Sequence, residues 1–105
     1  EYIFINDVVE SFARALKTDK KLGGEVIHIG RNKNYSVNDV IETLEQCWNR
    51  KIKKEYIKMR PGETPIEIVL DNKKLKSLLD YELQWDLARG LKYTIPYYEN
   101  AFKNI

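Results

Sequence analysis

Apolar residues recur at intervals of three and four positions in four stretches of the chain, which is the spacing of one face of an α-helix. A residue able to cap a helix N-terminus opens each stretch, and these are Asp7, Ser36, Asp71 and Asp86. The apolar stripes behind them are Val8, Phe12, Ala15 and Leu16; Val37, Val40, Ile41, Leu44 and Trp48; Leu75, Leu78 and Leu79; and Leu87, Leu91, Ile95, Tyr98 and Phe102. The pattern predicts four helices, the last of them kinked or split by Pro96, which has no backbone donor.

Short runs rich in β-branched and aromatic residues lie outside these helices, as is typical of strands. They cover residues 2–5, 25–29, 52–57 and 66–70. The sequence Arg60-Pro61-Gly62-Glu63 separates the last two runs and is typical of a tight turn. The chain is therefore predicted to be a small mixed α+β domain, with about four helices and short strands.

Composition fits a single folded domain that spans residues 1–105. Of the 105 residues, 43% are hydrophobic and 32% are charged, which is too apolar for a disordered chain. The apolar runs are too short for a membrane span, so we expect no membrane partner. Cys47 and His28 are the single cysteine and histidine, which excludes an internal disulfide and an all-protein zinc site. No signal peptide is visible, and we expect a reducing, cytoplasmic setting.

Charge argues against a nucleic-acid partner. There are 18 basic and 16 acidic residues, for a formal net charge of +2. Nucleic-acid-binding domains usually carry a clustered basic excess. The densest basic stretch, 50–54, is followed at once by Glu55, and an exposed helix end explains it better than a phosphate track. The chain also lacks the glycine-rich loops of dinucleotide and P-loop sites.

The turn at 60–63 is the stretch that best suits a ligand. Proline followed by glycine favours a type II turn, which brings the first and last residues within about 7 Å at Cα. Arg60 and Glu63 are therefore expected side by side. A guanidinium can hold a phosphate through two parallel hydrogen bonds, and a carboxylate can accept from a sugar diol. From spacing alone, an exposed turn whose charges are merely solvated is the better interpretation.

A set of short motifs in a particular order along the chain favours the ligand-binding interpretation of this turn. They are Tyr2-Ile3-Phe4-Ile5-Asn6-Asp7-Val8-Val9, Val26-Ile27-His28-Ile29-Gly30, Ser36-Val37, Arg60-Pro61-Gly62-Glu63, Asp71 with Lys74 and Leu78-Leu79, and Gly90-Leu91 with Thr94 and Tyr97-Tyr98. Over essentially the whole chain, this order resembles the C-terminal portion of the NAD-dependent epimerase/dehydratase family, which are extended short-chain dehydrogenase/reductases acting on nucleotide sugars. Each motif is weak alone, and the ordered set is fairly specific.

The resemblance implies a substrate-binding lobe that packs on an N-terminal Rossmann domain, in cis or in trans. By analogy with the family motifs, Arg60 contacts the diphosphate of a nucleotide sugar, Glu63 contacts the ribose, and Tyr2 lies beside the nucleotide. Asp7 matches the aspartate of the same motif as Tyr2, and a helix-cap role accounts for it. NAD is expected in the N-terminal domain, which this chain does not contain, and no cofactor or metal is expected in the chain itself.

Departures from the family pattern argue against catalysis by this chain alone. None of its tyrosines has a lysine four positions later, so the catalytic Tyr-x-x-x-Lys pair is missing and no catalytic residue is assigned. The family's asparagine before Gly30 is His28 here, which we interpret as structural. The chain also begins after the position of a second phosphate-binding arginine and without methionine, so we expect a separate or excised lobe.

A second hypothesis remains open at the level of sequence. The chain could be a non-catalytic remnant or a self-associating interaction module without a ligand. A lobe without its Rossmann partner should expose an apolar face, or cover it by forming a homo-oligomer. The sequence does not identify the base or the sugar, and it does not separate an epimerase from a dehydratase, decarboxylase or reductase.

Overall fold

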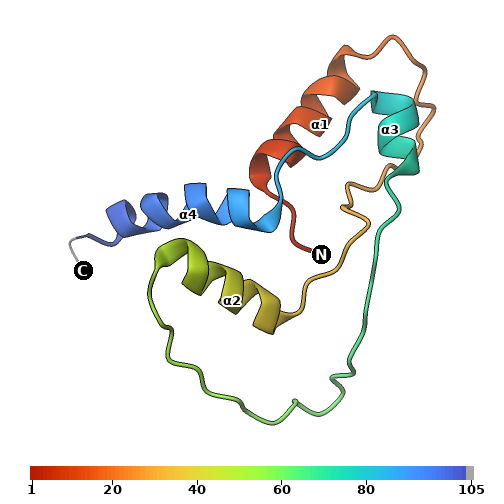
Figure 1. Ribbon diagram of the computed structural model, residues 1–105. Helices are drawn as coiled ribbons and strands as arrows, with labels where there is room; N and C mark the ends of the chain where they lie inside the picture. Colours follow the sequence, from red (N-terminus) through yellow and green to blue (C-terminus); the bar gives the residue numbers. More distant parts are fainter. Residues whose placement is uncertain (104–105) are drawn as a thin grey trace.

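The computed structural model describes residues 1–103 and contains four helices within them (Figure 1). They are α1 (Ile5–Lys17), α2 (Val37–Trp48), α3 (Lys73–Leu79) and α4 (Leu87–Ala101). The predicted number of helices and their approximate positions are confirmed. Among these residues, no helix is long and apolar enough to cross a bilayer.

The predicted strands are not confirmed, because residues 1–103 contain no strand. Residues 25–29, 52–57 and 66–70 have no regular structure, and Ile5 is already the first residue of α1. β-Branched residues favour an extended backbone, but a strand also needs a neighbour that pairs with its N–H and C=O groups. Most of 52–57 and 66–70 is exposed instead of paired. Within the described part of the chain, the fold is therefore helical with long irregular connections.

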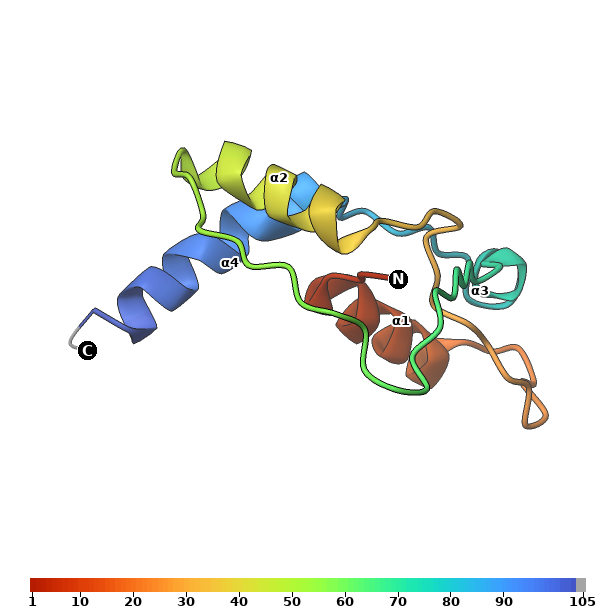
Figure 2. The same cartoon turned by 90° about the horizontal axis from the view of Figure 1, so that it is seen from below.

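The helices form two pairs (Figures 1 and 2). α1 packs against α3, and α2 packs against α4. The α2–α4 pair lies to one side of the N-terminal segment and the α1–α3 pair to the other. Residues 49–72 connect the pairs as a wide loop that swings out from both of them. The C-terminal half of α4 extends beyond α2.

A small buried core holds the α1–α3 pair together. Leu75, Leu79 and Tyr81 are its buried apolar residues, and Asp7 and Ser11 of α1 are buried beside them. Partly buried side chains complete the cluster; they are Ala15, Leu22, Ile27, Ile29 and Leu83.

Aromatic contacts join the N-terminal segment to α4. The rings of Phe4 and Trp85 lie 4.5 Å apart, and Trp85 meets Tyr93 edge-on at 4.9 Å. Phe4 also packs on Gly90, where an added Cβ would lie 3.0 Å from the phenyl ring. A larger residue at this position of α4 would therefore push the N-terminal segment away.

The chain is much more open than a domain of its size. Its accessible surface is 8812 Å², whereas a compact protein of 12.4 kDa exposes about 6,100 Å². The radius of gyration is 17.2 Å, against about 13 Å expected for a compact chain of 105 residues. This open arrangement leaves many large apolar side chains exposed, among them Phe12, Ile57 and Phe102.

The N-cap residues predicted from the sequence are confirmed for α2 and α4 and are wrong for α1 and α3. Ser36 and Asp39 form a reciprocal capping box on α2, and Asp86 accepts from the Arg89 N–H at 2.8 Å at the start of α4. The predictions that Asp7 and Asp71 are N-caps are wrong. α1 begins after Phe4, and α3 begins after Asn72, although Asp71 still accepts from the Lys73 N–H at 2.7 Å.

The structure tests three expectations about α2 and α4: that Pro96 kinks or splits α4, and that Tyr98 and Trp48, which fall on apolar stripes, are core residues. Pro96 does not split α4, which runs without interruption from Leu87 to Ala101. Tyr98 is 51% exposed and does not belong to a core. Trp48 is only partly buried, and its indole N–H donates to Glu99 at 2.6 Å. An apolar helix stripe is buried only where another element covers it, and here α4 reaches beyond its partner helix.

Candidate functional site

The 60–63 turn has the predicted backbone geometry. The Glu63 N–H donates to the Arg60 carbonyl at 3.0 Å, which closes a four-residue turn. Gly62 has φ +86°, close to the value that a type II turn requires at its third position. Glycine is needed here because a Cβ would strain this left-handed conformation.

The turn places the Arg60 and Glu63 side chains against each other. Arg60 Nε and Nη2 each lie 2.8 Å from Glu63 Oε1, and Glu63 Oε2 accepts from the Arg60 backbone N–H at 2.8 Å. The Arg60 side chain is 82% exposed and that of Glu63 is 42% exposed. The predicted juxtaposition is confirmed, and both groups are open to solvent.

Tyr2 lies in a different part of the molecule. It is 44% exposed and lines a hollow of about 190 Å³ together with Phe4, Trp85, Gly90 and Thr94. The N-terminal segment lies between the two helix pairs, whereas residues 60–63 lie on the outer part of the wide loop (Figure 1). Within residues 1–103, no hydrogen bond or ion pair joins Tyr2 to Arg60 or Glu63. The structure therefore brings together two of the three predicted site residues.

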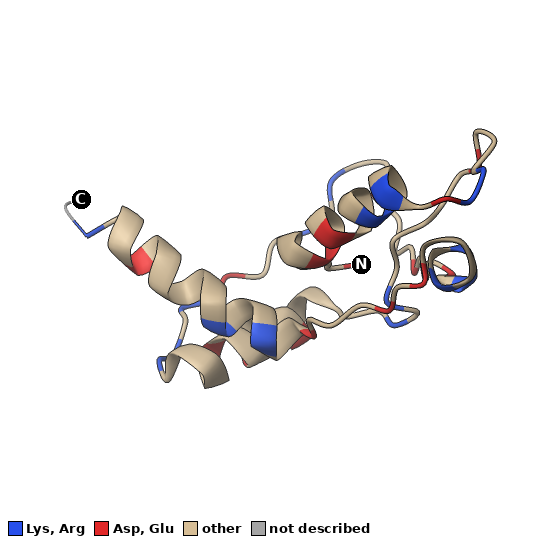
Figure 3. Ribbon diagram, turned by 90° about the horizontal axis from the view of Figure 1, so that it is seen from above, with Lys and Arg blue, Asp and Glu red and all other residues tan. Residues whose placement is uncertain are grey.

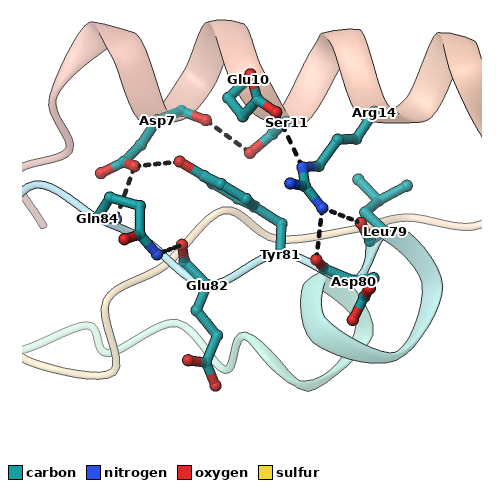
Figure 4. Close-up of polar contacts among 9 residues, drawn as sticks. All are labelled: Asp7, Glu10, Ser11, Arg14, Leu79, Asp80, Tyr81, Glu82 and Gln84. Atoms are coloured by element: carbon teal, nitrogen blue, oxygen red, sulfur yellow. Dashed lines mark hydrogen bonds and ion pairs between the residues drawn. The ribbon is translucent and has the colours of Figure 1, made fainter.

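Asp7 is the polar centre of the fold, a role that sequence reasoning missed (Figure 4). Its side chain is fully buried and accepts from the Tyr81 hydroxyl at 2.6 Å, the Gln84 N–H at 2.9 Å and the Trp85 N–H at 3.1 Å. A buried carboxylate is tolerated when its oxygens are hydrogen-bonded. Because the partners lie 74 to 78 positions away in the sequence, no local pattern could have identified them.

Tyr81 is held in its neutral form by the same arrangement. Burial, and then its hydrogen bond to Asp7, raises the pKa of Tyr81 to about 12. The Arg14 guanidinium lies 4.9 Å from the centre of the Tyr81 ring. At neutral pH such a phenol stays protonated, so it donates a hydrogen bond and does not act as a general base.

Arg14 lies on the other side of Tyr81 from Asp7 and completes a cluster of these three residues. Its Nη1 donates to the Asp80 carbonyl at 2.6 Å, and its Nε donates to Glu10 at 3.0 Å. Asp80 ends α3 in a left-handed conformation with φ +50°, so Arg14 binds a carbonyl at the C-terminus of α3. No buried side-chain nitrogen or oxygen atom among residues 1–103 lacks a hydrogen-bond partner. We therefore assign this cluster to the fold and not to a ligand.

The charged residues do not gather into one patch (Figure 3). In α1 the acidic residues lie near the N-terminus and the basic ones near the C-terminus, which suits the helix dipole. No group of His, Cys, Asp and Glu among residues 1–103 has metal-binding geometry.

Comparisons with known proteins agree with the order of motifs along the chain. No family model matches. UDP-glucuronate 4-epimerase from Thermodesulfobacterium geofontis is 32% identical over 96 residues, which are 90% of this chain and 28% of that enzyme. UDP-glucose 4-epimerase GEPI48 from Cyamopsis tetragonoloba is 29% identical over 87% of this chain and 25% of its own length.

A solved structure decides the assignment. UDP-glucuronic acid 4-epimerase from Bacillus cereus, in complex with UDP-glucuronic acid and NAD, matches 94% of this chain with a TM-score of 0.84 and 32% identity. The chain belongs to the NAD-dependent epimerase/dehydratase family. It corresponds to the C-terminal region of these enzymes and spans less than a third of the relatives that it matches, with 28% of the first and 31% of the solved structure.

Proposed function

We propose that this chain is the nucleotide-sugar-binding lobe of an NAD-dependent epimerase or dehydratase. In this proposal Arg60 binds the diphosphate, Glu63 binds the ribose hydroxyls, and Tyr2 lies beside the nucleotide. The lobe does not catalyse the reaction by itself. The observation that supports the proposal most directly is the juxtaposition of Arg60 and Glu63 at an exposed turn, in a chain whose relatives include an epimerase solved with a UDP-sugar.

The Arg60–Glu63 ion pair is compatible with ligand binding. An exposed pair of this kind contributes at most about 1 kcal/mol. A diphosphate offers more charge and a better bidentate geometry to a guanidinium than a single carboxylate oxygen does. A nucleotide can therefore take over Arg60 at small cost, and this frees Glu63 to accept from sugar hydroxyls.

The lobe would contribute binding energy and orientation to the reaction. Contacts to the nucleoside diphosphate are remote from the reacting sugar carbon, and remote contacts position the reacting centre. The Tyr-x-x-x-Lys pair and the dinucleotide loop are absent from this sequence. Proton transfer and NAD binding are therefore assigned to the part of the enzyme outside this chain.

The proposal is tested by titrating the purified chain with UDP, TDP and GDP while recording amide NMR spectra. We expect weak binding, with a dissociation constant of about 1 mM or higher, and shifts centred on 60–63. Arg60→Ala should abolish these shifts. Arg50→Ala is the matched control, because Arg50 is an exposed arginine that lies over the Trp48 ring and away from the turn.

Shifts that persist in the Arg60→Ala variant, or that lie far from residues 60–63, would contradict the assignment. A stronger response to one of the three nucleotides would identify the preferred base.

A further inference from the structure

Three segments that are far apart in the sequence meet at the carboxylate of Glu1. Glu1 Oε2 accepts from the Arg31 backbone N–H at 3.0 Å, and Glu1 Oε1 accepts from the Leu70 backbone N–H. These partners lie 30 and 69 positions away in the sequence. We call Glu1, Gly30, Arg31 and Leu70 the Glu1 junction. It joins the N-terminal segment to the segment that leads into α2 and to the end of the 49–72 loop (Figures 1 and 2).

Gly30 allows the backbone of Leu70 to come this close to the junction. Gly30 is buried, and an added Cβ would lie 2.5 Å from Leu70 Cβ, 2.7 Å from the Leu70 carbonyl oxygen and 3.1 Å from Glu1 Oε2. Because one of these atoms belongs to the backbone, an alanine at this position would push Leu70 away from Glu1. The junction therefore depends on a carboxylate at position 1 and on the lack of a side chain at position 30.

Both hydrogen bonds of Glu1 use the charge of the carboxylate. A backbone N–H that donates to an ionised carboxylate forms a stronger hydrogen bond than one that donates to a neutral group. Each oxygen of Glu1 accepts one N–H, so the side chain needs two acceptor atoms, whereas a glutamine has only one. Loss of the carboxylate would leave the partly buried N–H groups of Arg31 and Leu70 without this acceptor.

The Glu1 junction lies between the two parts of the proposed nucleotide site. Glu1 directly precedes Tyr2, and Leu70 lies at the end of the loop that carries Arg60 and Glu63. The hydrogen bond from Leu70 to Glu1 is thus a direct polar contact between the segment of Tyr2 and this loop. An exposed loop with few other contacts takes its position from the points at which it is fixed.

The beginning of the loop is fixed in a similar way but to a different segment. Glu45 of α2 accepts from the Ile52 N–H at 3.0 Å, and the ammonium groups of Lys51 and Lys54 each lie 3.5 Å from its carboxylate. This contact holds the loop to α2 and does not involve the N-terminal segment. Of the two carboxylates, Glu1 is therefore the one that can set the position of the loop relative to that segment.

We propose that Glu1 is a positioning residue of the nucleotide site. Its carboxylate holds the end of the 49–72 loop against the segment that carries Tyr2, so that one nucleotide can contact Tyr2 and the 60–63 turn together. The role in nucleotide binding rests on the proposed function, whereas the junction itself rests on the two hydrogen bonds of Glu1 and on the close packing at Gly30. Glu1 acts through the loop and is not a catalytic residue.

The first measurement needs no nucleotide. Glu1→Gln keeps the size of the side chain but removes its charge and one acceptor oxygen. In amide NMR spectra of the purified chain, the Arg31 and Leu70 signals should move more than those of other residues that are not adjacent to position 1. Their hydrogen exchange should become about tenfold faster or more. Glu67→Gln is the matched control, because Glu67 is an exposed glutamate on the same loop.

The second measurement follows UDP binding at both parts of the site. In the wild-type chain, the Tyr2 ring and the 60–63 amides should respond to UDP with the same dissociation constant. In Glu1→Gln the 60–63 amides should still respond, because the turn is closed by its own hydrogen bonds. The Tyr2 response should fall about threefold or more, because the two parts are no longer held together. A general loss of folding would weaken both responses equally, so an unequal loss is specific to positioning.

Gly30→Ala tests the same junction by another route. It leaves the carboxylate in place but pushes Leu70 away from it, so it should give the same unequal loss at Tyr2. Because both substitutions break one junction, the double variant Glu1→Gln/Gly30→Ala should be little worse than either single variant. Fully additive losses would show that the two residues act separately and would overturn the proposal.

Two further results would overturn it. One is unchanged hydrogen exchange of the Arg31 and Leu70 amides in Glu1→Gln. The other is an equal fractional change of the UDP responses at Tyr2 and at 60–63 in that variant. A wild-type chain that does not respond to UDP would refute the proposed function instead. The exchange data would then still decide whether Glu1 holds the end of the loop.

Discussion

Asp7 shows how one buried carboxylate can organise a fold with very few buried residues. It binds one side-chain hydroxyl and two backbone N–H groups, so removing it leaves three buried or partly buried donors without their acceptor. We predict that Asp7→Ala lowers the free energy of unfolding by about 3 kcal/mol or more, and Tyr81→Phe by about 1 kcal/mol. Urea denaturation followed by circular dichroism measures both. Asp19→Asn, in the exposed loop after α1, should change the midpoint little. An equally small effect of Asp7→Ala would contradict the central role of this carboxylate.

Tyr81 gives the fold a specific sensitivity to alkaline pH. Its pKa is raised from 10.0 to about 12 in the folded chain, so the folded state favours the neutral phenol. The stabilisation is fully present below pH 10 and is lost as the pH rises towards 12. The absorbance of tyrosinate should show one late step as the pH approaches 12, and this late step should disappear in Tyr81→Phe. A wild-type titration without a late step would show that the phenol is not protected.

At the scale of elements, the sequence predicted correctly those features that depend on residues close together in the chain, such as the helix caps of α2 and α4. The capping box of α2 is built from Ser36 and Asp39, three positions apart, and both reciprocal hydrogen bonds are present. Asp86 also caps its helix as predicted. The strands failed because pairing needs a distant neighbour, which the described chain does not supply. Asp7 failed as a cap for a related reason, since its partners come from residues 81–85.

The candidate site also has one part that the sequence could predict and one part that it could not. Arg60 and Glu63 could be placed side by side from the sequence, because a Pro-Gly turn fixes their separation. The position of Tyr2 relative to them depends on the course of the 49–72 loop, for which the sequence holds no local signal.

The capping box provides a test at this scale. Ser36→Ala removes the side-chain acceptor for the Asp39 N–H, and it should destabilise the chain by about 1 kcal/mol, with fraying at the start of α2 in NMR spectra. Ser77→Ala, within α3, is the control and should be near neutral. The hydrogen bonds from Ser36 also lower the pKa of Asp39 below 3.8. The contribution of Asp39 is therefore present above that pH and is lost as the pH falls below it. Unchanged α2 signals in Ser36→Ala would contradict the capping role.

At the scale of the whole molecule, the 49–72 loop stands out because few contacts hold it in place. It connects the α2–α4 pair to the α1–α3 pair, and nearly all of it is exposed (Figures 1 and 2). Its hydrogen bonds are few and lie mainly at the 60–63 turn and where Glu45 accepts from the Ile52 N–H. Segments with few buried contacts and exposed backbone open most easily. Arg60 and Glu63, two of the three proposed ligand residues, thus lie on a segment that is expected to open easily.

Limited proteolysis with trypsin tests this description of the molecule. The loop offers Lys51, Lys53, Lys54 and Lys58, whereas Arg14 and Lys17 lie in α1. We predict that the first cuts fall within 51–58, because a protease needs an extended, accessible backbone and a helix must unfold to provide one. The two fragments should separate the α1–α2 portion of the sequence from the α3–α4 portion. Saturating UDP should slow these cuts if the nucleotide orders the loop around Arg60, and it should not do so in the Arg60→Ala variant. Initial cleavage at Arg14 or Lys17 would show instead that α1 opens before the loop, and would contradict this prediction.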